Sequence, residues 1–174
     1  DKAQKRPIEG GLAFGGYVEI NEAAAAQLAE GTEEGRQNIL TIAKENGIDE
    51  EDAKDYIDGI EKELCNPLMA AIGKIEVERQ AMDLKEIMAD WADYVITLCE
   101  ASEEHAQEYQ RAVRRKGKSL AGAIGAVLKE SWKIKQKIPK EIAEAAGISG
   151  ARVEMGIPGY ATINRILREY YLEG

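Results

Sequence analysis

The sequence predicts a mainly α-helical protein, a multi-helix bundle that follows a short irregular or β-like N-terminal segment. Three observations lead to this prediction. Only 6% of the 174 residues are aromatic, while Ala and Glu are abundant, a mixture typical of helical proteins. Apolar residues recur at three- and four-residue spacing in several segments. Short stretches with Gly, Pro, Asn or Asp separate these segments, as expected for short connections between packed helices.

The first 20 residues are expected to form an irregular segment. They contain Pro7 and two glycine pairs between positions 10 and 16, which favour loop conformations. Residues 17–20, Tyr-Val-Glu-Ile, have the composition of a short strand. Asn21 is expected to cap the Ala-rich helix that follows, since Asn is favoured at helix N-caps.

Two more helices are predicted before residue 65. The first begins near Thr32 and stops at Gly47. Asp49 precedes the second, because Asp is a favoured N-cap and a helical apolar pattern follows it. That pattern consists of Ala53, Tyr56, Ile57, Ile60 and Leu64.

Asn66-Pro67 is expected to open the next helix, since proline suits a first helical turn. The clearest helical pattern comes after it. Its apolar residues are Leu84, Ile87, Met88, Trp91, Val95 and Leu98. Their spacing of i, i+3, i+4 and i+7 predicts an amphipathic helix.

Four helices are predicted in the remaining sequence. Ser102 is a candidate cap for a polar helix that runs to Lys116. The next helix, from Leu120, carries small residues at positions 121–126 that allow another helix to approach closely. Pro139 opens a short helix, and the last helix includes Ile163 to Tyr170. The small-residue face packs either within one subunit or between two, so a homo-oligomer is one expectation.

Three regions are expected along the chain: an N-terminal Gly-rich segment (1–20), an acidic helical region (21–116), and a basic helix with a C-terminal helical subdomain (117–174). The last two regions either are separate or form one domain. The longest apolar stretches fall far short of the ~20 residues of a membrane helix. The expected location is the cytoplasm of a bacterial host cell, with no membrane contact and with reduced thiols at Cys65 and Cys99.

Charge is distributed unevenly along the chain. The formal net charge is −9, which excludes a wholly basic nucleic-acid coat protein. Residues 19–63 hold 14 acidic and 4 basic side chains, a net of −10. Residues 111–140 hold 10 basic side chains and one acidic, a net of +9. The two blocks either serve different partners, attract each other, or are solvated faces of ordinary helices.

No catalytic or cofactor motif is complete, so a non-enzymatic protein without cofactor or metal is expected. Residues 117–119, Gly-Lys-Ser, resemble the end of a phosphate-binding loop, but Ala112 stands where that loop needs Gly. The acidic residues 49–55 lack the alternating ligands and central Gly of a calcium loop. A small enzyme or metalloprotein using His105 and the two cysteines is the weakest of three hypotheses.

The acidic block predicts a partner-binding surface. On the helix after Asp49, acidic residues are expected along one face, opposite the apolar pattern. Grooves that bind nucleic acid are lined by Lys and Arg, so an acidic helix can occupy such a groove as a decoy. The candidate contact residues are Glu50, Glu51, Asp55, Asp58 and Glu61.

The C-terminal block predicts nucleic-acid contact instead. Residues 140–149 resemble the first helix and turn of a helix-turn-helix, and residues 162–168 resemble a recognition helix. The stretch between them is longer than the usual turn. Candidate contacts with nucleic acid are Arg111, Arg114, Arg115, Lys116, Lys118, Arg165 and Arg168.

Four stretches resemble small phage and prophage proteins of Firmicutes, some of which are anti-CRISPR inhibitors of Cas9. The stretches are residues 42–49, 63–69, 114–122 and 155–171, and the resemblance covers residues 40–172. It implies a cytosolic, non-enzymatic protein that binds an RNA-guided nuclease with its guide RNA and inhibits DNA binding or cleavage. The alternative hypothesis is a phage DNA-binding regulator that uses the helix-turn-helix-like end.

Overall fold

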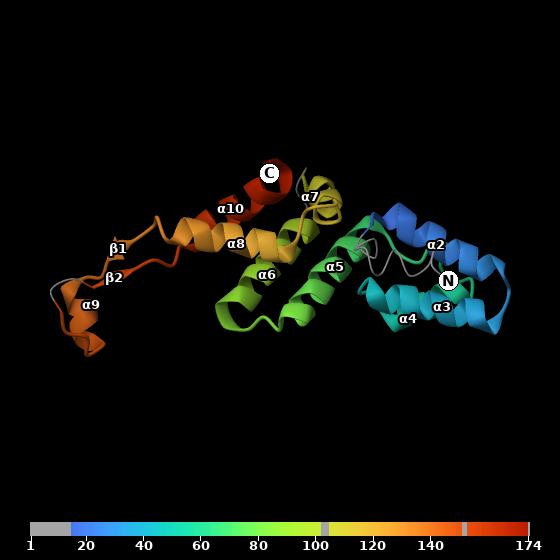
Figure 1. Ribbon diagram of the computed structural model, residues 1–174, viewed down its shortest axis with the longest axis horizontal. Coiled ribbons are helices and arrows are strands. Elements are labelled where there is room, and N and C mark those ends of the chain that lie inside the picture. Colours follow the sequence, from blue (N-terminus) through green and yellow to red (C-terminus); the bar gives the residue numbers. More distant parts are fainter. Residues whose placement is uncertain (1–14, 102–104, 151–152, 174) are drawn as a thin grey trace.

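The structure is a computed structural model that describes residues 15–101, 105–150 and 153–173. These residues form nine helices and one two-stranded antiparallel ribbon in an elongated molecule (Figure 1). The predicted mainly α class is confirmed. Most of the predicted irregular N-terminal segment, residues 1–14, lies outside the described residues.

Three helices form a lobe at the N-terminal end of the molecule, which we call the N-terminal lobe (residues 15–66). They are α2 (Tyr17–Ala29), α3 (Glu33–Glu45) and α4 (Glu50–Ile57). The lobe has its own buried cluster, which extends into the first turn of the following helix. Its members are Ile20, Ala24, Ile39, Ala43, Ile48, Ala53, Tyr56, Leu64, Cys65 and Ala70.

The predictions for residues 17–21 are wrong. Residues 17–20 form the first turn of α2 and no strand, because Ile20 and Ala24 are drawn into the apolar cluster by helical spacing. Asn21 lies inside α2 and does not cap it. Its amide donates to the Cys65 carbonyl (2.9 Å) and accepts from the Cys65 N–H (3.0 Å), which satisfies two backbone groups of an irregular segment.

Helix α4 is shorter than predicted. It ends at Ile57, and Gly59 adopts a left-handed conformation (φ +79°) that reverses the chain. Ile60, which was predicted to continue the apolar face, is therefore 68% exposed. Leu64 reaches the apolar cluster from an irregular segment instead.

Three predicted helix starts are confirmed by their capping hydrogen bonds. The Thr32 hydroxyl accepts from the Gly35 N–H (2.9 Å), and the Asp49 carboxylate accepts from the Glu51 N–H (2.9 Å). Asn66 accepts from the Met69 N–H (2.8 Å), and Pro67 follows it in the first turn. The cap predicted at Ser102 lies outside the described residues.

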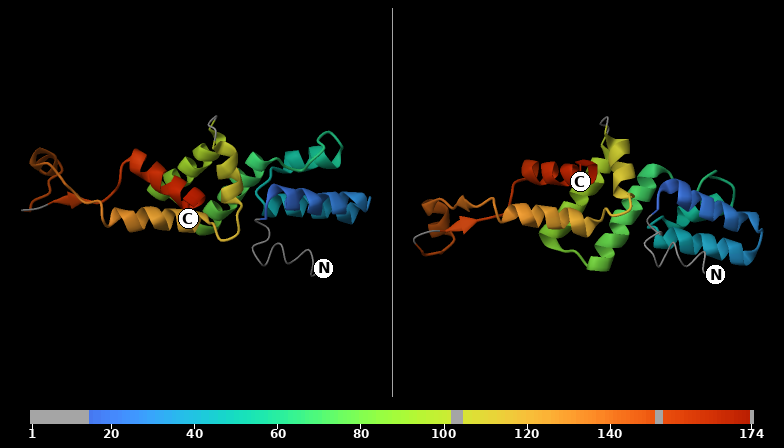
Figure 2. Two further views of the ribbon diagram at one scale, coloured as in Figure 1. Left: turned by 90° about the horizontal axis from the view of Figure 1, so that it is seen from above. Right: turned by 45° about the horizontal axis from the view of Figure 1, so that its top comes forward.

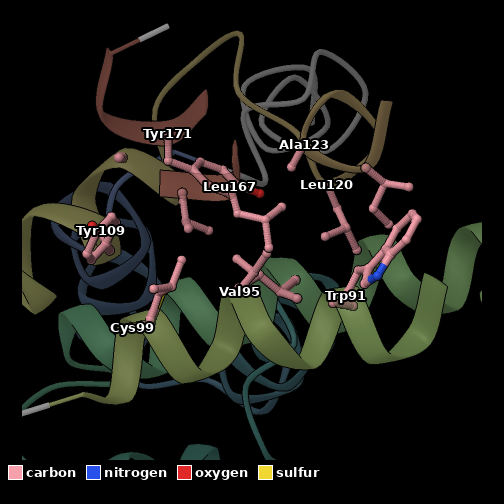
Figure 3. Close-up of a cluster of buried hydrophobic side chains, with 14 of the residues drawn as sticks. Trp91, Val95, Cys99, Tyr109, Leu120, Ala123, Leu167 and Tyr171 are labelled. Atoms are coloured by element: carbon pink, nitrogen blue, oxygen red, sulfur yellow. The ribbon is translucent and has the colours of Figure 1, made fainter. Parts of the chain in front are cut away.

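Five helices build the central body. They are α5 (Pro67–Met82), α6 (Glu86–Glu100), α7 (Ala106–Val113), α8 (Leu120–Ser131) and α10 (Tyr160–Glu173). Their shared core brings together Trp91, Val95, Cys99, Tyr109, Leu120, Ala123, Leu167 and Tyr171 (Figure 3). This core and that of the N-terminal lobe divide within α5, between Ala70 and Ala71.

Residues 132–150 and 153–159 leave the central body as an arm between α8 and α10 (Figures 1 and 2). The arm contains β1 (Gln136–Lys137), α9 (Lys140–Ala145) and β2 (Glu154–Met155). The two strands pair antiparallel, with Gln136 opposite Met155 and Lys137 opposite Glu154. Within the described residues, no helix combines the length and apolar character needed to cross a membrane.

Candidate functional site

The basic block is divided between two places in the molecule. Arg114, at the end of α7, contacts the N-terminal lobe, whereas the lysines that follow α8 lie farther away. All 14 acidic side chains of the −10 block belong to the N-terminal lobe. The arm, which carries Lys133, Lys135, Lys137 and Lys140, projects from the opposite end (Figures 1 and 2). These arm lysines therefore do not neutralise the acidic block within one chain.

The predicted acidic contact residues are mostly accessible. Glu50, Glu51, Asp58 and Glu61 are exposed, and Asp55 is half-buried. Because α4 ends at Ile57, these residues form no single helical stripe. Glu61 instead lies after the chain reversal at Gly59. In that reversal the Ile60 N–H donates to the Asp55 carbonyl (2.9 Å). We call these five residues the acidic end.

Lysine neutralises the acidic end only in part. The Lys54 ammonium lies 3.7 Å from a carboxylate oxygen of both Glu50 and Glu51. These side chains are all at least half exposed, so the pairs contribute little to stability. A partner with a higher density of cations can therefore replace Lys54 at low cost.

A groove of about 650 Å³ lies beside the acidic end and adds an apolar component to it. Its lining includes the exposed Ile60, acidic Asp52, Glu61 and Glu63, and the exposed cation Lys62. The predicted contacts did not include Ile60, Asp52 or Glu63. Ile60 was expected to be buried in a helix that continued to Leu64. The Gly59 in the middle of that pattern was the signal for the earlier helix end.

Arg114 is wrong as a predicted nucleic-acid contact, because its side chain is buried between the lobe and the central body. Its guanidinium donates to the Gly15 carbonyl (2.6 Å), the Ala70 carbonyl (3.0 Å) and the Asn46 side-chain oxygen (3.0 Å). Burial lowers the pKa of Arg114 to about 10, so it stays charged at neutral pH. Arg114 holds the two cores together.

Lys118 is also engaged inside the protein. Its ammonium donates to the Tyr170 carbonyl (2.7 Å) and lies 4.7 Å from the centre of the Tyr170 ring. These contacts join the turn before α8 to the last helix, so Lys118 acts in packing. Arg111, Arg115 and Lys116 remain exposed beside it.

Buried Lys74 and half-buried Glu78 fasten the connection between α7 and α8 onto α5. The Lys74 ammonium donates to the Val113 carbonyl (2.6 Å) and the Lys118 carbonyl (2.7 Å). Glu78 accepts from the Leu120 N–H (2.8 Å) and lies 4.0 Å from Lys74. Burial lowers the pKa of Lys74 to about 8 and raises that of Glu78. Sequence inspection missed this pair, whose only signal was charge inside an apolar pattern.

The helix-turn-helix prediction is wrong in its geometry. Helix α9 lies at the tip of the arm, whereas α10 packs back along α8 in the central body (Figure 1). Ile163, Ile166 and Leu167 of α10 enter the shared core, so the face predicted to read DNA is partly used for packing. Arg168 is exposed, and Arg165 pairs with Glu169 (3.2 Å) on the outer face.

The groups considered for catalysis lie apart. His105 contacts Glu108 (3.3 Å) on an exposed surface, while Cys65 and Cys99 belong to different buried clusters. Burial raises the thiol pKa to about 11 for Cys65 and about 12 for Cys99, which makes both unreactive at neutral pH. Among the described residues, no three or more His, Cys, Asp and Glu side chains gather closely enough to hold a metal ion.

Comparisons of the chain with protein-family models, with curated proteins and with solved structures find no match. Its binding chemistry is therefore inferred from its own charged and exposed side chains.

Proposed function

We propose that this protein is a non-enzymatic binding protein whose acidic end occupies a cationic, nucleic-acid-binding groove of a partner protein. The separation of charge carries this proposal. A lobe with a net charge of −10 lies far from the lysine-rich arm, so its charge is not compensated by that arm. Like charges held together on one lobe repel each other, and a cationic partner relieves that repulsion.

The partner class follows from the chemistry of the acidic end. Channels that hold nucleic acid present rows of Lys and Arg side chains to a phosphate backbone. Glu51, Asp58 and Glu61 present carboxylates to such cations, and exposed Ile60 supplies an apolar contact next to them. Long-range attraction between the two surfaces makes association fast and strongly dependent on salt.

The specific partner that we propose is a Cas9-type nuclease loaded with its guide RNA. Four stretches resemble small phage and prophage proteins, some of which inhibit Cas9, and this resemblance favours Cas9, whose channel and motif-reading arginines are cationic. An acidic end placed there competes with target DNA, and DNA binding or cleavage is lost as a result.

Binding to purified Cas9 with guide RNA tests the proposal, measured at low and at physiological ionic strength alongside target cleavage. The triple variant Glu51→Gln, Asp58→Asn, Glu61→Gln removes three charges with little change in shape. It is expected to weaken binding about tenfold or more, mainly through slower association. The matched control, Glu86→Gln, Asp90→Asn, Glu100→Gln, removes three exposed charges from α6.

The control variant is expected to bind like the unmodified protein. No binding at low salt, together with unchanged cleavage at excess protein, would refute the proposal. Equal losses in the two triple variants would show that total charge matters and that the acidic end has no special role.

The alternative function, a DNA-binding regulator, loses its main structural supports. Helices α9 and α10 do not form the predicted module, and Arg114 and Lys118 are used inside the fold. Arg111, Arg115, Lys116 and Arg168 remain as exposed cations.

A further inference from the structure

An exposed tryptophan marks the root of the arm. Trp132 follows the last turn of α8 and is 78% exposed, whereas Trp91 in the core is only 3% exposed. Leu128 (46% exposed) and Met155 (42% exposed) are neighbours of Trp132 in one groove of about 450 Å³. Large apolar side chains gathered at the surface commonly mark binding sites.

The groove has a defined backbone framework. Gly156 brings the returning chain so close to α8 that an added Cβ would lie 3.0 Å from the Ser131 carbonyl oxygen. The Ser131 hydroxyl in turn donates to the Val127 carbonyl (2.9 Å), within the same helix. The end of α8 and the start of the arm are thereby held in one arrangement with Trp132 between them.

The surroundings of Trp132 are basic. Lys129, Lys133 and Lys135 are exposed within four residues of it, and Lys135 lines the groove. Two acidic residues offset part of this charge: Glu130 lies 3.9 Å from Lys133, and Glu154, which pairs in register with Lys137 in the ribbon, also lines the groove. An aromatic ring bordered by lysines favours an anionic ligand that also carries flat rings.

We propose that the root of the arm binds single-stranded nucleic acid, with a base stacked on Trp132 and phosphates contacted by Lys129, Lys133 and Lys135. Every base has a face that can stack on an aromatic side chain, so the interaction tolerates many sequences. Lysines along the same path neutralise the backbone. In a duplex the faces of each base are already stacked on the neighbouring base pairs, so a duplex binds less well.

Binding of a strand at the root of the arm does not require the acidic end. It needs only the arm root, and it locates nucleic-acid contact away from the cations beside α7 that the sequence indicated. An acidic protein surface, including the N-terminal lobe of a second copy, offers charge to the lysines but no stacked bases to Trp132. The aromatic ring therefore favours nucleic acid.

Fluorescence anisotropy of a labelled oligo-dT or oligo-U strand of about 15 nucleotides tests the proposal with the full-length protein alone. Trp132→Ala is expected to weaken binding about tenfold, because it removes the stacking platform. The triple variant Lys129→Gln, Lys133→Gln, Lys135→Gln is expected to weaken binding further. It should also reduce the slope of a plot of log binding constant against log salt concentration by about two.

Controls separate this site from other charged surfaces. Arg111→Gln, Arg115→Gln, Lys116→Gln removes three exposed cations beside α7 and is expected to leave binding of the strand unchanged. The acidic-end triple variant should also bind the strand normally, even if it no longer binds Cas9. Circular dichroism should show the same melting temperature for Trp132→Ala and the unmodified protein, since the ring is exposed.

Three results would overturn the proposal. The first is no anisotropy change at low salt with any strand. The second is equal weakening by the α7 and the arm variants. The third is self-association in analytical ultracentrifugation that Trp132→Ala abolishes while no strand binds, which would assign the groove to a second copy of the chain.

Discussion

Lys74 is a buried cation whose pKa is lowered by the fold. Its buried ammonium donates to the carbonyls of Val113 and Lys118, around the C-terminal end of α7. Helix C-termini carry partial negative charge, so a cation is well placed there. Burial nevertheless outweighs this attraction and that of Glu78, and it lowers the Lys74 pKa from an ordinary value of 10.5 to about 8.

Because of this lowered pKa, the stability of the protein is expected to change with pH in the alkaline range. Between pH 8 and 10.5 the unfolded chain keeps a proton on Lys74 that the folded protein has released. The free energy of unfolding, compared with that of Lys74→Met, is therefore expected to rise with pH across this window. The rise is about 1.4 kcal/mol for each unit of pKa difference.

Urea unfolding of both proteins near pH 7 and near pH 10 measures this effect. Cysteine and tyrosine residues also titrate at alkaline pH, but they are present in both proteins and cancel in the difference. A difference that is constant with pH, or that falls as pH rises, would contradict the assignment of a lowered pKa to Lys74.

Helix α8 contains two glycines in different surroundings, Gly122 in a close contact with α10 and Gly125 in open space. The Tyr170 ring of α10 occupies the space that a Cβ on Gly122 would need, and the Tyr170 hydroxyl accepts from the Ser119 N–H (3.0 Å). Gly125 has open space around its Cα. The predicted close approach of another helix is thus confirmed at Gly122, and the helix that approaches belongs to the same chain.

Alanine substitutions at these two positions are expected to have opposite effects. Gly122→Ala forces Tyr170 to move and should destabilise the protein by about 1–3 kcal/mol, as overpacking does. Gly125→Ala should stabilise it by about 0.5–1 kcal/mol, because Ala is the better helix former. Thermal unfolding followed by circular dichroism measures both, and effects of the same sign would contradict this packing.

The described molecule has two cores that share helix α5 and are further linked by the Arg114 side chain. This side chain reaches from α7 to the start of α2 at Gly15, to α5 at Ala70 and to the end of α3 at Asn46. Asn46 is itself buried, and its amide donates to the Ile42 carbonyl (2.8 Å). Removing the guanidinium leaves several buried acceptors without their donor.

Arg114→Met is therefore expected to lower the free energy of unfolding by about 3 kcal/mol. Arg115→Met, at the exposed neighbouring position, should change it by less than about 0.5 kcal/mol. Urea denaturation gives both values, and amide hydrogen exchange should show faster exchange in the N-terminal lobe of Arg114→Met. Equal stabilities for the two variants would rule out a joining role for Arg114.

Several features of this protein could be predicted from interactions between residues close together in the sequence. Thr32, Asp49 and Asn66 cap helices as predicted, because a cap depends only on residues two or three positions away. The spacing of Trp91, Val95 and Leu98 likewise identified a buried helix face. The acidic end was predicted from its composition, although the chain reversal at Gly59 changed its shape.

Sequence alone determined the helical class, the capped helix starts and the sign of each charged block, since all of these follow from composition and local spacing. Tertiary structure decided which charged side chains are exposed to partners. It buried Arg114, tied Lys118 to Tyr170, separated α9 from α10, and left Trp132 exposed among lysines. These outcomes depend on contacts between residues far apart in the chain, because burial and separation are properties of the packed molecule.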